Sequence, residues 1–149
     1  MDTLFSILHV VSAVFIVGPM AILPMTAMRA VRAGNGAQVA VLAKSTNLMS
    51  LLSLLVVVFG FGVMGMADPK YDLSVTTPWV LWSIILYLVA LGISLFVVVP
   101  TMRKAAEALK ANEGSATAAA PTKYPAIAAG SGVVALLLVA VTVLMVWKP

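Results

Sequence analysis

The chain has 149 residues, of which 62% are hydrophobic and 9% charged, and its formal net charge is +4. An average soluble domain is about a quarter charged, and so short a chain cannot bury this much apolar surface in one aqueous core. The composition therefore predicts a protein that lies in the lipid bilayer. The chain has no cysteine, which excludes disulfides and thiol chemistry, and it shows no basic face interleaved with aromatic residues, so we expect no nucleic-acid partner.

The first predicted element is an apolar helix over residues 3–33, which contains "LFSILHVVSAVFIVGPMAILP" and the single histidine, His9. A membrane-spanning helix needs about 20 apolar residues, and this run is longer. We expect Pro19 and Pro24 to reshape its second half. A cleaved signal peptide is the alternative, but the run has no basic segment before it and no small-residue cleavage site before Arg29.

Three further runs are long enough to cross a bilayer, and turn residues separate them. The stretch Gly34-Asn35-Gly36 is a helix stop and turn signal, and Pro69 and Pro78 bracket a non-helical loop. The remaining helices are expected at about 37–67, 78–112 and 124–147. The sequence thus predicts one all-α transmembrane domain over residues 1–149, a four-helix bundle with up-down-up-down topology.

The basic residues predict the orientation of this bundle, because cytoplasmic loops carry an excess of lysine and arginine. Seven of the nine basic residues lie after the apolar run of the first or the third helix: Arg29, Arg32, Lys44, Arg103, Lys104, Lys110 and Lys123. Only Lys70 and Lys148 lie on the opposite side, where Trp79, Trp82 and Trp147 form an expected aromatic belt. We therefore expect both termini to lie outside the cytoplasm.

The two inward-running helices end on similar sequences. "LPMTAMRAVRAG" closes the first helix and "VPTMRKAAEALKANEG" closes the third, and both place a proline, a threonine and Met-Arg at the predicted inner boundary. A direct repeat of a helical hairpin would give this pattern. The alternative is that inner helix ends use Pro and Arg in general.

His9 belongs to a predicted layer of polar side chains inside the bundle. The members of this layer are His9, Ser12, Ser83, Tyr87 and Thr142. An ionisable residue inside a membrane is a functional hypothesis by default. The ring could bond Ser83, Tyr87 or Thr142 and fix helix packing, or it could be an axial ligand of a b-type haem. In the haem case Met64, Met145 or a second copy would supply the other ligand. A role in binding a proton, a ligand or a partner subunit is the third possibility.

Two segments are rich in small residues and predict close helix packing, either within the bundle or against another protein. They contain Gly60, Gly62 and Gly65 in the second helix, and Ala126, Gly130 and Gly132 in the fourth.

Catalytic and transport motifs are not found in the sequence. The nine methionines are scattered, which favours core filling over copper transport. No acidic residue lies inside the apolar run of a predicted helix, although cation-coupled transporters usually need one. We therefore expect no catalysis, no metal site and no resident cofactor, with haem b as the alternative cofactor.

The first helix, with His9, Gly18 and Pro24, resembles the opening helix of small four-helix bacterial proteins described as predicted integral membrane proteins of unknown function. More distantly it looks like helix 1 of the copper-resistance D and HemJ membrane families. The HemJ resemblance would imply a haem-binding role for His9.

The sequence as a whole favours a non-catalytic, multi-pass protein of the bacterial inner membrane. Its expected partners are the lipid bilayer, through its basic loops, and other membrane protein subunits. The expected role is an accessory or assembly subunit of a larger complex such as a respiratory supercomplex. The alternatives are a haem-binding redox or carrier protein and a small transporter.

Overall fold

The structure is a computed structural model, which describes residues 2–66, 76–112 and 125–147. These residues are helical apart from short turns, and they form four spans long and apolar enough to cross a membrane. The all-α prediction is therefore confirmed. Most of the loop predicted between Pro69 and Pro78 lies outside the described residues. The same is true of Lys70, Lys123 and Lys148.

The observed helix bounds lie within two residues of the predicted ones, but two of the spans contain a π-helical turn. In chain order the elements are α1 (Asp2–Ser12), η1 (Ala13–Val17), α2 (Gly18–Arg32), α3 (Gly36–Gly65), α4 (Pro78–Ile93), η3 (Ser94–Val98), α5 (Val99–Asn112) and α6 (Pro125–Trp147). The first span is α1, η1 and α2 in continuous order, and the third is α4, η3 and α5.

The predicted stop after the first span is a Schellman motif. Gly34 has a φ of +72°, and its N–H donates to the carbonyl of Val31 while the N–H of Asn35 donates to that of Ala30. Glycine suits this position because it has no Cβ to clash in the left-handed region. Asn35 then caps α3, since its side-chain oxygen accepts the N–H of Gln38 at 3.1 Å.

Each π-helical turn ends two residues before a proline. The N–H of Gly18 donates to Ala13, and that of Val99 donates to Ser94, five residues back instead of four. Pro19 and Pro100 follow, and each lacks an N–H and would clash with the carbonyl four residues earlier in a regular helix. The wider turn relieves this clash, so the spans continue past their prolines.

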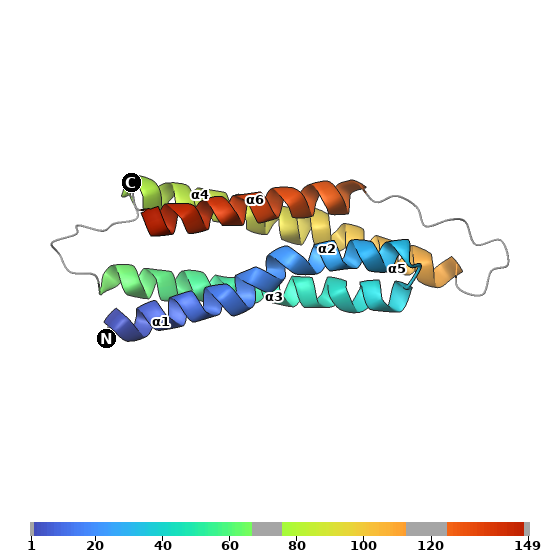
Figure 1. Cartoon of the computed structure of the whole chain (residues 1–149), viewed down its shortest axis with the longest axis horizontal. Coiled ribbons are helices and arrows are strands. Elements are labelled where there is room, and N and C mark those ends of the chain that lie inside the picture. Colours follow the sequence, from blue (N-terminus) through green and yellow to red (C-terminus); the bar gives the residue numbers. More distant parts are fainter. Residues whose placement is uncertain (1, 67–75, 113–124, 148–149) are drawn as a thin grey trace.

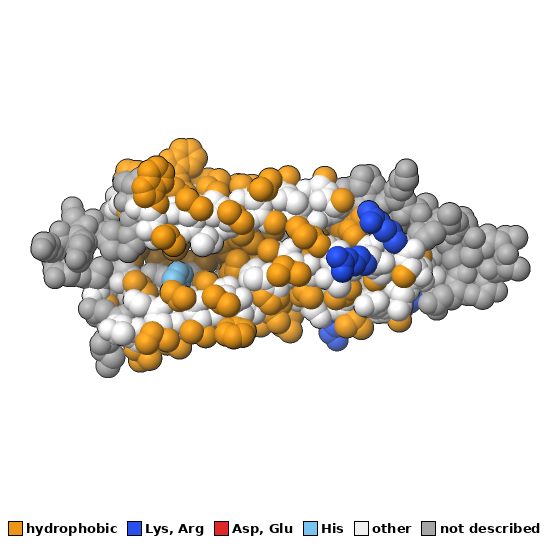
Figure 2. Space-filling model, in the orientation of Figure 1, with side chains coloured by type: hydrophobic (Ala, Val, Ile, Leu, Met, Phe, Trp, Pro, Cys, Tyr) orange, Lys and Arg blue, Asp and Glu red, His pale blue; other side chains and the backbone are white. Residues whose placement is uncertain are grey.

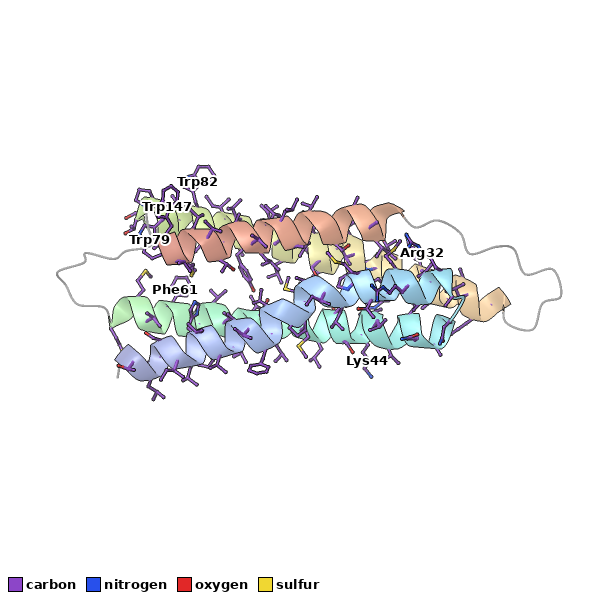
Figure 3. The ribbon with its side chains drawn as sticks, viewed as in Figure 1. Arg32, Lys44, Phe61, Trp79, Trp82 and Trp147 are labelled. Atoms are coloured by element: carbon purple, nitrogen blue, oxygen red, sulfur yellow. The ribbon has the colours of Figure 1, made fainter. Side chains whose placement is uncertain are left out.

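The four spans lie along one long axis in two layers (Figure 1). α1 and α3 form one layer at the end where α1 begins and α6 ends, and α4 and α6 form the other. Figure 3 shows Trp79, Trp82 and Trp147 together at this end, and Arg32 and Lys44 near the opposite one. We call these the tryptophan end and the basic end.

The core consists of two clusters of buried side chains. The cluster near the basic end is built mainly from small residues: Ala27, Ala30, Val31, Val39, Ala43, Val98, Met102, Ala105, Ala106 and Ile127. The second contains Met20, Tyr87, Ala90, Leu91, Val134 and Leu138. In the described part of the chain neither cluster includes a residue of α1, whose packing is mainly against α3 and η1.

Candidate functional site

The candidate site is the contact between His9 of α1 and the backbone of α3. The Nδ1 of His9 lies 2.8 Å from the carbonyl oxygen of Val56. A carbonyl oxygen only accepts hydrogen bonds, so Nδ1 carries the proton and donates it to this bond. In the neutral ring this leaves a free lone pair on Nε2.

Two glycines of α3 make room for aromatic rings of α1. A Cβ on Gly60 would lie 3.0 Å from Cε1 of His9, and a Cβ on Gly62 would lie 2.6 Å from Cδ1 of Phe5. The rings therefore pack directly against the α3 backbone. Gly60 allows the imidazole to lie this close, because a Cβ at position 60 would require the ring to shift by a few tenths of an ångström.

The Nε2 atom of His9 is not fully buried. It makes no hydrogen bond within the described part of the chain, where every fully buried polar side-chain atom has a partner. Figure 2 shows the pale-blue histidine at the edge of a hollow between the two layers, surrounded by hydrophobic side chains. The site therefore offers one oriented nitrogen ligand in an apolar setting.

The structure does not form the predicted hydrogen bonds between His9 and the polar side chains of neighbouring spans. The hydroxyls of Ser83 and Thr142 donate to carbonyls of their own helices, those of Trp79 and Leu138. Ser12 does the same with Leu8 and His9, at 2.6 and 3.1 Å. A hydroxyl inside a helix commonly bonds back to its own backbone. Ser12, Ser83 and Thr142 therefore form no hydrogen-bond network with the His9 ring.

Tyr87 bonds across the bundle to α3 and not to His9. Its Oη lies 2.5 Å from the Oγ of Ser53, which also donates to the carbonyl of Ser50. The Oγ of Ser50 lies 2.8 Å from that of Ser94 in η3. Two hydroxyl pairs therefore join α3 to the third span. The sequence shows all four residues as polar side chains inside spans, but it does not show how they pair.

The predicted close-packing faces are only partly used within the bundle. Gly60 and Gly62 meet α1, and a Cβ on Gly130 would lie 2.9 Å from Cγ2 of Val98. Nothing lies within 4 Å of a Cβ built on Gly65 or Gly132. These two positions make no close contact within the described part of the bundle, and their packing against another protein stays a prediction. The side chain of Ala126 lies outside the described residues.

Acidic and metal-binding side chains do not gather at this site. In the described ranges no group of three or more His, Cys, Asp or Glu residues could hold a metal ion. Any metal at His9 would need a ligand set of its own, as haem provides through its four ring nitrogens.

The four apolar spans define a multi-pass α-helical membrane protein. Its one histidine lies at the edge of a hollow (Figure 2). The chain belongs to the family of predicted integral membrane proteins DUF2269, whose pattern matches residues 3–149. The family expectation from the first helix is thereby confirmed. No curated protein and no solved structure matches the chain, and the more distant likeness to the copper-resistance D and HemJ families stays a prediction.

Proposed function

We propose that the chain is a non-catalytic accessory or assembly subunit of a larger complex, such as a respiratory supercomplex, in the bacterial inner membrane. The observation that supports this role is the poor coverage of the first span. Only 6% of its most apolar window is buried within the protein, against 33% for the third span. Membrane helices associate by close packing, and the first span leaves large apolar side chains such as Val14 and Phe15 exposed for another subunit.

The partner is expected to contact the exposed apolar face near η1. Phe15 is 71% exposed and sits four residues before Pro19, while Phe96 is 80% exposed and sits four residues before Pro100. The two phenylalanines therefore form a matched pair on the first and the third span.

Mild purification of the tagged chain from its native membrane tests this role. We expect stoichiometric membrane proteins to co-purify, to be lost with Phe15→Ala and to remain with the control Phe96→Ala. A monodisperse, partner-free protein would contradict the proposal. Equal loss with both variants would place the partner elsewhere.

The second candidate function is haem binding by His9, and the Nδ1 bond to Val56 favours it. A histidine that binds a metal through one ring nitrogen almost always donates its other N–H to a carbonyl or carboxylate, which orients the ring. His9 has this arrangement, and the histidine lies at the edge of a hollow (Figure 2). Haem would supply the iron and its redox chemistry, and His9 would hold the iron through a ring nitrogen, with Met64, Met145 or a second copy as the second protein ligand.

Titration of the purified protein with haem b tests this candidate. We expect a Soret band shifted from that of free haem, which is lost in His9→Ala and kept in Ser12→Ala, a variant one turn away on the same helix. A spectrum that stays that of free haem would rule out the candidate.

A further inference from the structure

The first and third spans carry the same features at a constant separation. The π-helical turns cover 13–17 and 94–98, and the prolines that follow are Pro19 and Pro100, so the residue numbers of each pair differ by 81. Each turn packs against the helix of the next span along the chain: η1 against α3, and η3 against α6.

Proline alone explains a π-helical turn, so the repeat needs evidence that does not depend on proline. Phe15 and Phe96 are again 81 residues apart, and both point out of the bundle. Ser50 in α3 and Ser131 in α6 also differ by 81, and both are buried, with 0% and 2% exposure. The ends of the helices keep the same spacing, since Gly65 and Trp147 differ by 82.

The contact between the helices has changed in a compensated way between the two halves. His9 packs on Gly60 in the first half, and the residues 81 positions later are Ala90 and Val141, which belong to one packed cluster. The first half thus has the ring of His9 on a glycine, whereas the second half has Ala90 and Val141 at the corresponding positions. The second pair follows the same rule: Phe5 and Gly62 correspond to Leu86 and Val143, a smaller apolar residue and a larger one.

We infer that the chain is a tandem pair of one helical hairpin with a shift of 81 residues, and that only the first copy keeps an accessible imidazole. The second copy closes the corresponding position with Ala90 and Val141. Gly60 and Gly62 are then the residues that make the first copy the ligand-binding one. Assigning a ligand to that copy rests on the proposed role of His9, whereas the duplication does not.

Substitution of the first copy by residues of the second tests the inference in the full chain. We expect Gly60→Val alone to lower the melting temperature, because its Cβ meets the His9 ring, and H9A/G60V to return it to the level of His9→Ala or above. In the same way, we expect Gly62→Val alone to lower the melting temperature and F5L/G62V to return it to the level of Phe5→Leu or above. Gly132→Val is the control, since its Cβ meets nothing within 4 Å. Failure of both double variants to recover would overturn the inference.

A second measurement moves the imidazole to the second copy. The chain has one histidine, so ¹⁵N-histidine NMR reports one ring; the wild type should show the Nδ1–H tautomer. The variant H9A/A90H/V141G should show the same tautomer, and a mixture of both tautomers would overturn the inference. If this variant does not fold, the melting temperatures of H9A/G60V and F5L/G62V test the inference. Neither measurement uses haem, so a failure of haem binding leaves the duplication standing.

Discussion

Hydroxyl side chains inside the spans differ in whether they join two helices. Ser83 donates to the carbonyl of Trp79 at 2.7 Å, within one helix. Tyr87, one turn later, reaches Ser53 on another helix, and both partners are buried. Bonds of the first kind satisfy a polar group, whereas bonds of the second kind also hold two elements together.

We predict that Tyr87→Phe destabilises the bundle more than Ser83→Ala. The loss should be about 0.6 kcal/mol, the average for hydrogen bonds between membrane helices, because the phenyl ring keeps the packing. Ser53 keeps its bond to the carbonyl of Ser50, which limits the cost. Unfolding in mixed micelles with increasing SDS measures both variants, and a larger loss for Ser83→Ala would contradict the prediction.

Helix contacts near the basic end depend on a glycine at the start of α3. A Cβ on Gly36 would lie 3.0 Å from the backbone nitrogen of Lys110 and 3.1 Å from the carbonyl oxygen of Ala106. These are backbone atoms of α5, which cannot rotate away as a side chain can. α3 and α5 therefore approach each other as closely as their backbones allow.

We predict that Gly36→Ala lowers stability, by about 1–3 kcal/mol as is usual for overpacking. The matched control is Gly18→Ala, because a Cβ there meets nothing within 4 Å and alanine favours the helix. Thermal unfolding followed by circular dichroism in detergent measures both. Equal melting temperatures for the two variants would show that α5 moves away without cost.

The sequence predicts the elements well and their contacts poorly. The four spans follow from apolar length, and the stop at Gly34 follows from turn chemistry. The partner of His9 was not predicted because Val56 contributes a backbone carbonyl, which no side-chain pattern shows. A repeat was one of two readings of the helix ends, and those ends placed Pro24 beside Pro100. The repeat that we infer pairs Pro19 with Pro100 instead, because each of these two prolines follows a π-helical turn, which no sequence pattern shows.

For the whole molecule, charge and aromatic residues separate to opposite ends. The described lysines and arginines lie in the last part of α2, the first third of α3 and α5. They are Arg29, Arg32, Lys44, Arg103, Lys104 and Lys110. The tryptophans gather at the other end. This distribution supports the proposal that the tryptophan end, with both chain termini, faces away from the cytoplasm.

Labelling of single cysteines tests this orientation, because the chain has no cysteine of its own. We predict that a membrane-impermeant maleimide labels Thr76→Cys in intact cells and labels Ala33→Cys only after the membrane is opened. Both positions are exposed. The reverse labelling pattern would invert the proposed orientation without affecting the fold.

The two π-helical turns also record an order of events. A π-helical turn is equivalent to one residue inserted into a regular helix, and here the insertion and its proline occupy the same place in both hairpins. On the duplication that we infer, the hairpin carried this insertion before it was copied, so the widened turn is older than the four-helix chain.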